Sequence, residues 1–558
     1  MPEETISDHD FAAKVGLRLF LKAKSGPGLW KLPPDMINKP GVKKIIDATV
    51  KRTRVTDGSS FELLTSRLNA GLRSYAREEG KRIRATTSHL AAAVAKLKQE
   101  AMADPHGFAH GELLESKVKQ LKEYHASRRE RMHICAGTKE EMVGEIASKH
   151  LSGKIQGRKA KTQIAELKIN GSTISDTKGI LHAAADFFSG IFGEDRRRCT
   201  RKWSPAPGRT LSREAAKELE ADWTEEEVKM AFQAMAARKS PGSDGLPKEL
   251  FEANWDTLGG SLMALAEDFA SIASLPAETK EAVTILLHKK GDRDSLNNYR
   301  PITLLKSSYK VLARVVANRI KRVLHQVISP EQYGFIPGRR LSDAVALVAD
   351  VIDAAKHGSE DWYLLLVDFQ KAFDSVSRIF IFMVLRNMGF PERFVAWVEG
   401  LHAGTTTKLL INGWLSEGIQ VRSGVRQGCP LAPYLFLCAV EPLAQLVEKR
   451  KLGLSLAGQR LAYLGYADDT TLILQGKNQI KKAVRALAKF EEESGLATNK
   501  GKSVVMPLGV NLTSHPIASD GFKWAAADEA ERLLGVWITP NGSCRPTWEK
   551  VLEAAEVA

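Results

Sequence analysis

Hydrophobic and polar positions follow different periods in the two parts of this 558-residue chain. From about 56 to 165 apolar residues recur at helical spacing, and "FELLTSRLNAGLRSYAREEGKRIRATTSHLAAAVAKLKQE" contains no proline, which predicts helices. Residues 203–210, "WSPAPGRT", have the composition of a linker. Strands and helices then alternate irregularly to about 540 without a fixed-period repeat, and 541–558 predict a short helix. Thr224 and Glu227 have the spacing of a capping box at a helix start.

Two apolar segments of the second part end in acidic residues. Residues 464–474, "LGYADDTTLIL", predict a strand, a tight turn with Asp468 and Asp469, and a second strand. Residues 362–376, "WYLLLVDFQKAFDSV", begin as a buried strand with Asp368 near its end. A charge in such a run is costly unless it is paired or bound to a metal. For the acid pair alone, the alternative is a solvated turn.

These three carboxylates become a metal site if the two segments are neighbours in the fold. Asp368, Asp468 and Asp469 would then offer oxygen ligands to hard cations, and Mg²⁺ suits a few carboxylates completed by substrate phosphates. Two metals roughly 4 Å apart can activate an attacking oxygen and stabilise a leaving one. The sequence therefore predicts two Mg²⁺ ions, with Mn²⁺ as a substitute, and phosphoryl transfer. Asp374 is expected to support the following turn or helix instead.

The charge of the chain favours a polyanionic partner. The formal net charge is +15 and the pI is near 9.4, which suits nucleic acid. Basic clusters occur at 128–131, 153–161 and 196–202; any one alone is more often a solvated face, whereas several in one basic chain favour a nucleic-acid surface. No apolar run reaches the length of a membrane span, and the first residues lack a secretory signal. Five scattered cysteines without a CxxC pair indicate neither a zinc site nor a disulfide framework, so an intracellular setting is expected.

The order of the motifs resembles the reverse transcriptase domain of LINE-type, non-long-terminal-repeat retrotransposons, over about 220–542. The motifs that carry this resemblance are, in order, "SPGSDGLPKELF", "LLHKKGDRDSLNNYRPITLL", "EQYGFIPGRR", "VDFQKAFDSV", "SGVRQGCPLAPYLF", "YADD", "SGLATNKGKSVVM" and "LLGVWITPNG". The family implies an α+β fold, a right-hand polymerase with fingers and a palm on an antiparallel sheet. A basic helical extension precedes it.

The flanking residues are interpreted through the same resemblance. "SDH" (Ser7, Asp8, His9) and the segment around Trp30 are similar to the very end of the family's endonuclease, but the upstream metal carboxylates of that domain are missing. The expected segments are a C-terminal endonuclease-like remnant at 1–50, a basic helical extension and linker at 51–210, fingers and palm at 211–542, and a truncated thumb at 543–558.

The resemblance also implies roles for the residues around the acids. Asp368 and Asp468 bind both metals, the backbone carbonyl of Phe369 assists, and Asp469 completes the acidic hairpin. A primer 3′-hydroxyl then attacks the α-phosphate of a deoxynucleoside triphosphate. Phe373 is expected to pack below the sugar and exclude a 2′-hydroxyl, whereas a core phenylalanine is the alternative from the pattern alone.

Two glycines and a glutamine in "SGVRQGCPLAP" match the nucleotide-binding loop of the family. Gly424 and Gly428 would let the backbone approach nucleotide or template, and Gln427 would supply a polar contact. A plain loop before the next helix is the alternative.

Basic residues on both sides of the acids are expected to contact the triphosphate. Arg300 is the preferred candidate because a guanidinium offers planar, directed donors, and Lys289 or Lys290 supplies a second charge. Lys502 matches the family lysine that protonates pyrophosphate, and Lys500 is close enough to leave that choice open.

The sequence thus predicts an RNA-directed DNA polymerase whose partners are template RNA, a DNA primer or target DNA, and dNTPs, without a membrane. The competing hypothesis is a catalytically inactive nucleic-acid-binding remnant that lacks a thumb. A group II intron maturase fits the flanks less well, and a viral RNA polymerase more often has Gly before the acids and lacks an aromatic gate. The extension before residue 200 is expected to hold template RNA by its phosphates, with a solvated helical face as the alternative. The nucleus and a cytoplasmic ribonucleoprotein are both compatible locations.

Overall fold

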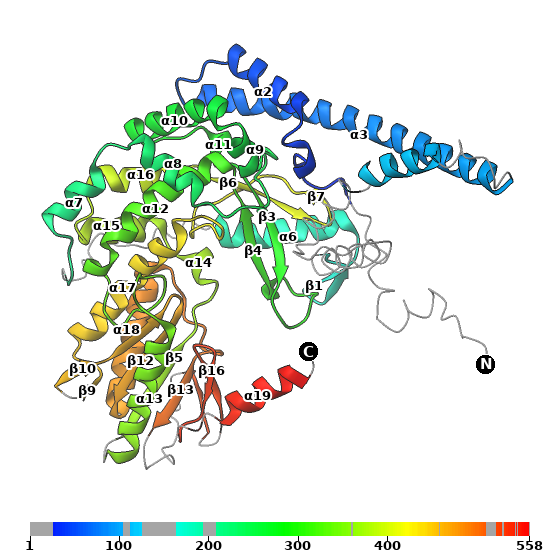
Figure 1. Ribbon diagram of the computed structural model, residues 1–558. Coiled ribbons are helices and arrows are strands. Elements are labelled where there is room, and N and C mark those ends of the chain that lie inside the picture. Colours follow the sequence, from blue (N-terminus) through cyan, green and yellow to red (C-terminus); the bar gives the residue numbers. More distant parts are fainter. Residues whose placement is uncertain are drawn as a thin grey trace, which may run out of the picture. The chain divides into compact units, whose positions relative to one another are not determined.

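A computed structural model describes most of the chain as two compact units (Figure 1). The described residues are 26–103, 112–124, 126, 163–193, 208–358, 361–456, 458–508, 521–526, 529–541, 543 and 545–556. The first unit comprises described residues of Met1–Phe187, Val228–Val311 and Thr406–Gly418, and the second those of Phe188–Glu227, Leu312–Thr405 and Ile419–Ala558. The "SDH" motif and the three basic clusters lie outside the described residues.

The first unit contributes four strands, in the order β4-β3-β6-β7, to a mixed sheet. Its strands are β3 (Ala282–His288), β4 (Tyr299–Leu304), β6 (Thr406–Ile411) and β7 (Trp414–Leu415). β3 pairs antiparallel with β4 and parallel with β6. Asn412 and Gly413 join β6 to β7 with φ of +50° and +85°, because Asn-Gly tolerates the left-handed region that a two-residue hairpin turn needs.

Helices precede and follow these strands along the chain of the first unit. The longest, α3, confirms the helix predicted from the spacing of apolar residues. α3 (Gly58–Ala103) begins where Asp57 Oδ1 accepts the Ser60 N–H at 2.8 Å, and it buries Phe61 and Leu64. The helices and 3₁₀ helices are η2 (Pro34–Met36), α2 (Pro40–Arg52), α3, α6 (Thr177–Phe192, which ends in the second unit), α9 (Lys248–Ala253), α10 (Trp255–Ile272), α11 (Ala277–Lys280) and η3 (Leu296–Asn298).

A short hairpin lies inside the segment expected to be a helical extension and linker. β1 (Leu167–Ile169) pairs with β2 (Ser172–Ile174) across Asn170 and Gly171, a second Asn-Gly turn. The Lys168 ammonium also forms an ion pair with Asp294 at 2.7 Å, so this hairpin contacts the β3–β4 connection within the first unit.

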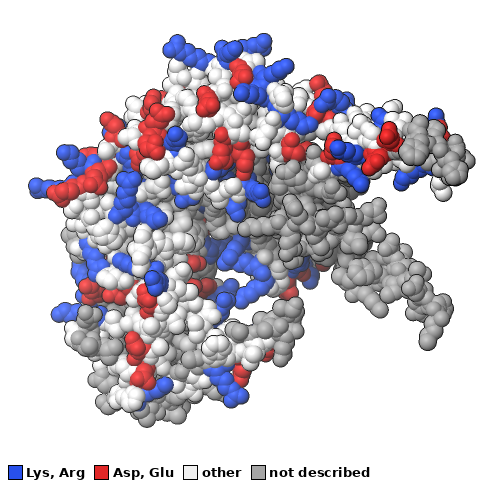
Figure 2. Space-filling model, in the orientation of Figure 1, with Lys and Arg blue, Asp and Glu red and all other residues white. Residues whose placement is uncertain are grey.

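The surface of α3 carries charges of both signs (Figure 2). Glu79 is 6% exposed and accepts hydrogen bonds from Lys39 at 2.5 Å and Arg82 at 2.9 Å, which lowers its pKa to about 2. Lys96 pairs with Glu100 at 3.6 Å. Part of the positive charge of this helix is therefore neutralised by the protein itself.

The second unit is built on a five-stranded sheet in the order β11-β12-β5-β13-β14. All neighbouring strands pair antiparallel except β13 with β14. The strands are β5 (Trp362–Val367), β11 (Tyr463–Tyr466), β12 (Asp469–Gln475), β13 (Val504–Leu508) and β14 (Lys523–Trp524). Central β5 is flanked on both sides, which explains its continuous apolar sequence and confirms the predicted buried strand.

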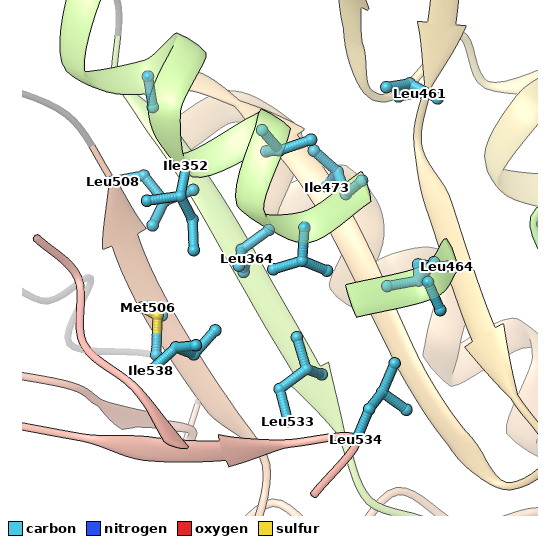
Figure 3. Close-up of a cluster of buried hydrophobic side chains, with 14 of the residues drawn as sticks. Ile352, Leu364, Leu461, Leu464, Ile473, Met506, Leu508, Leu533, Leu534 and Ile538 are labelled. Carbon is cyan, nitrogen blue, oxygen red and sulfur yellow. The ribbon is translucent and has the colours of Figure 1, made fainter. Parts of the chain in front are cut away.

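Helix α13 (Leu341–His357) covers one face of this sheet, and Figure 3 shows the cluster it forms with the strands. Ile352 packs with Leu364 of β5, Ile473 of β12 and Met506 of β13, all at most 5% exposed. Leu365 is fully buried as well, and successive strand residues point to opposite faces, so the second face is also covered. α15, α17 and α18 pack against one another, and α18 contacts β12 and β5.

The second unit contains further helices and short strands. They are α7 (Arg213–Glu220), α8 (Glu225–Gln233, which ends in the first unit), α12 (Ser307–Val327, which begins in the first unit), α14 (Ala372–Ser375), α15 (Arg378–Asn387), α16 (Glu392–His402), β8 (Ile419–Gln420), α17 (Ala432–Lys449), β9 (Leu454–Leu456), β10 (Gln459–Leu461), α18 (Gly476–Ser494), β15 (Glu531–Leu533), β16 (Val536–Ile538) and α19 (Arg545–Glu556).

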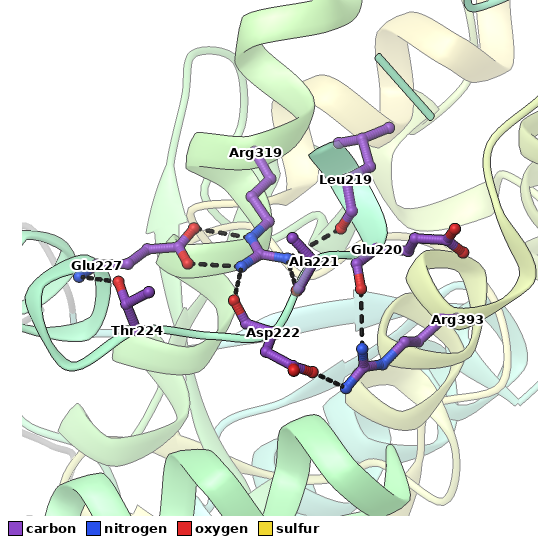
Figure 4. Close-up of polar contacts among 8 residues, drawn as sticks. All are labelled: Leu219, Glu220, Ala221, Asp222, Thr224, Glu227, Arg319 and Arg393. Atoms are coloured by element: carbon purple, nitrogen blue, oxygen red, sulfur yellow. Dashed lines mark hydrogen bonds and ion pairs between the residues drawn. The ribbon is translucent and has the colours of Figure 1, made fainter. Parts of the chain in front are cut away.

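A buried arginine organises the loop between α7 and α8 (Figure 4). The Arg319 guanidinium donates to both carboxylate oxygens of Glu227 at 2.7 and 2.6 Å, and to the backbone carbonyls of residues 219, 221 and 222. Thr224 Oγ1 accepts the Glu227 N–H at 3.2 Å, so this half of the predicted capping box is confirmed. The other half is wrong, because the Glu227 carboxylate binds Arg319 instead.

Within the part of the chain that the structure describes, no helix is long and apolar enough to cross a membrane.

Candidate active site

The two adjacent acids lie at the turn of the β11–β12 hairpin, as predicted. Tyr466 pairs with Asp469, which leaves Ala467 and Asp468 as a two-residue turn. Ala467 has φ of +58°, a left-handed conformation that an alanine seldom adopts, and both acids are exposed. The strained turn therefore presents the Asp468 carboxylate at the tip of the hairpin.

The third acid follows the neighbouring strand at the same end of the sheet. Val367 at the end of β5 pairs with Thr470, so the register continued by one residue sets Asp368 opposite Asp469 on the same face. The pKa of Asp469 is raised, first by burial and then by the negative charges of Asp468 and Asp368. The three like charges thus act on one another, and a cation near them would relieve the repulsion.

Among the described residues, no three His, Cys, Asp or Glu side chains gather closely enough to enclose a metal ion. The structure thus does not show the three acids as a closed metal cage, although their charges act on one another.

The backbone after Asp368 adds a carbonyl oxygen to this end of the sheet. Phe369 forms an isolated antiparallel bridge with Thr498, and the two flanking backbone hydrogen bonds lie at 2.7 and 2.9 Å. In such a pair, the N–H and C=O of the central residue point away from the partner segment. Since β12 lies on the other side of β5, the Phe369 carbonyl points toward the side of the acidic turn.

Asn499 is a neighbour of Asp368 that sequence reasoning missed. Its Nδ2 donates to Asp368 Oδ2 at 3.1 Å, and its backbone N–H donates to the Asp368 carbonyl at 2.7 Å. Ser503 Oγ accepts the Asp368 N–H at 3.0 Å. The quoted motif "SGLATNKGKSVVM" contained this signal, but only its lysines were considered.

Gln332 is the second residue that sequence reasoning missed, and its buried side chain is hydrogen-bonded to the acidic turn. Its side chain is 1% exposed, and Oε1 accepts the N–H of Ala467 at 3.1 Å and of Gly334 at 3.0 Å. Nε2 donates to Tyr463 Oη at 3.3 Å, and Gln332 bridges to Gly465 of β11. One buried amide thereby connects the loop before α13 to the residue that precedes Asp468.

The candidate lysines lie on the turn that begins at Asn499. Lys500 and Lys502 are both exposed, and the Lys502 N–H donates to the Asn499 carbonyl at 3.0 Å. Because both side chains start from this turn beside Asp368, the choice between them stays open.

Phe373 has one ring face covered. It stacks on Phe436 of α17 with centroids 4.5 Å apart and planes at 19°, and it is partly exposed. The Val425 N–H donates to its carbonyl at 2.7 Å. The ring is therefore held by neighbours of the second unit, as a rigid wall requires.

The loop that contains Gln427 is hydrogen-bonded to Asp374, the residue after Phe373. Gln427 Nε2 donates to both carboxylate oxygens of Asp374, at 3.1 and 3.0 Å. Asp374 is 7% exposed. Gly424 (φ +72°) approaches the Asp374 backbone so closely that a Cβ would overlap it, so here the glycine serves chain packing. Gly428 (φ +113°) is exposed.

The basic residues expected to contact phosphate belong to the first unit. Arg300 of β4 pairs with Leu287 of β3, and Lys289 and Lys290 follow the end of β3. All three basic side chains are exposed on one hairpin. They form a positively charged end of that sheet.

Residues 287–535 match the family model described as reverse transcriptase (RNA-dependent DNA polymerase). This segment is a reverse transcriptase domain, and relatives of the chain are proteins of non-long-terminal-repeat retrotransposons, which confirms the resemblance.

Relatives in transposable elements match a larger part of the chain. "Transposon TX1 uncharacterized 149 kDa protein" of Xenopus laevis is 32% identical over 376 residues, 66% of this chain and 28% of the relative. The Pol polyprotein from the type-1 retrotransposable element R2 of Popillia japonica is 25% identical over 350 residues, 59% and 48%. "RNA-directed DNA polymerase from mobile element jockey" of Drosophila melanogaster is 24% identical over 330 residues, 56% and 35%. The chain thus spans less than half the length of each.

Proposed function

We propose that this chain is an RNA-directed DNA polymerase that joins deoxynucleoside triphosphates to a primer 3′-hydroxyl by two-metal nucleotidyl transfer. The observation that carries the proposal is the position of Asp368 opposite Asp469, beside the turn that presents Asp468. The reverse transcriptase match over 287–535 supports the same chemistry.

The acids suit Mg²⁺ ions whose remaining ligands come from the substrate. Mg²⁺ is usually bound by one or two carboxylates plus substrate phosphates rather than by a complete protein cage. The three carboxylates offer oxygen donors only, and the pKa of Asp469 is raised by burial and then by the negative charges of Asp468 and Asp368, which a cation would compensate. Asp368, Asp468, Asp469 and the Phe369 carbonyl would hold the ions. When bound, such a pair activates the attacking hydroxyl and stabilises the leaving pyrophosphate.

The surrounding residues then act on the substrate. Asn499 keeps the Asp368 carboxylate in one orientation by its 3.1 Å hydrogen bond. Phe373, backed by Phe436, excludes the 2′-hydroxyl of a ribonucleotide. Lys502 or Lys500 supplies a proton to the leaving pyrophosphate.

We assign the second unit's sheet to the palm and the first unit's β3–β4 hairpin to the fingers. Arg300 and either Lys289 or Lys290 would then contact the triphosphate. Gln427 and Gly428 would contact the nucleotide or the template. Template RNA and a DNA primer or target DNA are the partners that this activity requires. A relative named for RNA-directed DNA polymerase activity, from the mobile element jockey, supports that assignment.

Primer extension on an RNA template tests the proposal. The chain should extend a DNA primer with dNTPs in the presence of Mg²⁺, and Asp468→Asn should abolish extension while it leaves RNA–DNA binding intact. Phe373→Val should raise incorporation of rNTPs relative to dNTPs at least tenfold. Binding without extension by the unsubstituted chain would contradict the proposal and favour the inactive remnant.

A further inference from the structure

Phe335 adopts a backbone conformation that a bulky residue avoids. Its φ is +57°, and among the described non-glycine residues with positive φ it is the only aromatic one. Two others, Lys371 and Ala467, lie within three residues of Asp368 and Asp468. Strained backbone of this kind persists where surrounding structure enforces it, and it concentrates at functional sites.

The loop that carries Phe335 is attached to the acidic hairpin. The Tyr333 N–H donates to the Gly465 carbonyl at 2.8 Å, and the Gly465 N–H donates to the Glu331 carbonyl at 2.9 Å. A Cβ on Gly334 would collide with the backbone nitrogen of Ala467. Residue 335 therefore follows directly on a segment in contact with the turn that presents Asp468.

The Phe335 side chain is exposed to solvent and is not packed in the core. It is 51% exposed, whereas the following Ile336 is 4% exposed. In the described part of the chain no aromatic ring is recorded against it, in contrast to Phe373. Arg340 nearby is exposed, and Arg339 is held by the carbonyls of residues 329 and 332. An exposed aromatic ring close in sequence to an exposed arginine suits a nucleic acid.

We propose that Phe335 is a stacking platform for a nucleobase of the primer–template bound at the acidic site. The proposal rests on the proposed function, because that function brings nucleic acid to the turn. A ring stacks on any base, since every base has a π face, so the contact adds affinity and position without sequence preference. The left-handed backbone at residue 335 turns the ring outward, and the contacts of Gln332 and Gly334 hold it beside Asp468.

Phe335→Asn provides a sharp test, because Asn tolerates the left-handed region better than Phe and removes only the ring. Affinity of the full chain for an RNA–DNA primer–template would be measured without divalent ions, so that catalysis is not required. Stacking is expected to contribute roughly five- to 150-fold per base. Phe335→Asn should weaken binding by that factor with an unchanged or higher melting temperature. Phe335→Trp should keep the affinity.

A matched control is Ile379→Gln, an exposed apolar residue (48%) on α15 of the same unit, which should leave the affinity unchanged. A 2-aminopurine base in the duplex should be quenched by the unsubstituted chain and not by Phe335→Asn. Equal affinity and equal quenching for Phe335→Asn would overturn the stacking proposal even if primer extension succeeds. Failed extension with binding that still depends on Phe335 would contradict only the polymerase proposal.

Discussion

Replacing Gln332 by Leu removes the acceptor that holds the acidic turn. The Gln332 amide oxygen accepts the N–H groups of Ala467 and Gly334, and all three residues are buried. A buried donor left without a partner costs about 1–3 kcal/mol. Two such donors predict a loss of about 2–6 kcal/mol in the free energy of unfolding, provided that water does not reach them.

The same substitution should lower kcat more than it changes the KM for dNTP. Ala467 is no longer held at positive φ, so Asp468 shifts, and a misplacement of about 1 Å can cost roughly 10²-fold in rate. The triphosphate contacts proposed for Arg300 are not touched. Single-nucleotide incorporation, measured below the melting temperature of the variant, separates the two constants.

Two further variants separate turn placement from general destabilisation. Tyr463→Phe removes the hydrogen bonds of the Tyr463 hydroxyl with Gln332 Nε2 and Thr470 but leaves the acceptor of the Ala467 N–H in place, so it should cost about 1 kcal/mol of stability per hydrogen bond and keep kcat. Ala467→Gly in the Gln332→Leu background should recover part of the rate, because glycine adopts positive φ freely. Full activity of Gln332→Leu, or an equal loss of kcat in Tyr463→Phe, would refute this reasoning.

Three other predictions concern the acids and the Arg319 network. Because the pKa of Asp469 is raised in the folded state, the contribution of Asp469 to stability is fully present at low pH and is lost as pH rises through that pKa. Asp469→Asn should therefore raise the melting temperature at pH 7 without divalent ions, and an unchanged melting temperature would argue against the repulsion. Asn499→Asp replaces the donor to Asp368 by a second carboxylate, whose repulsion should displace the Asp368 carboxylate and lower kcat; an unchanged kcat would count against Asn499 as a positioning residue. Arg319→Met leaves the buried Glu227 charge uncompensated and should cost about 3–5 kcal/mol in urea unfolding, whereas the double variant with Glu227→Met should recover most of it.

Local patterns predicted the elements that present the acids because those elements have strong local signals. β5 reads as a continuous apolar run since it is flanked on both sides, and the β11–β12 hairpin has its acids at a tight turn. The hairpin at 167–174 was not predicted, although Asn170-Gly171 is a strong turn signal, because helical spacing dominated the interpretation of that segment. Glu227 was misread because its partner, Arg319, is 92 residues away in sequence.

The sequence could name the acids but not the residues that hold them. Gln332 and Asn499 act through hydrogen bonds across 135 and 131 residues, and neither residue type signals such a role by itself. The hydrogen bond from the Gln427 amide to Asp374 was likewise not foreseen. Pairings of this kind depend on which strands become neighbours, and hydrophobic periodicity does not specify that.

The central claim is that Asp368 and Asp468 share two divalent ions with the incoming nucleotide. Electron paramagnetic resonance with Mn²⁺ tests it directly, on the full chain bound to an RNA–DNA primer–template whose primer ends in a dideoxynucleotide. The account predicts two bound Mn²⁺ per chain that appear only when the matching dNTP is added, and fewer in Asp368→Asn and in Asp468→Asn. The same stoichiometry in the unsubstituted chain and in both variants would contradict it.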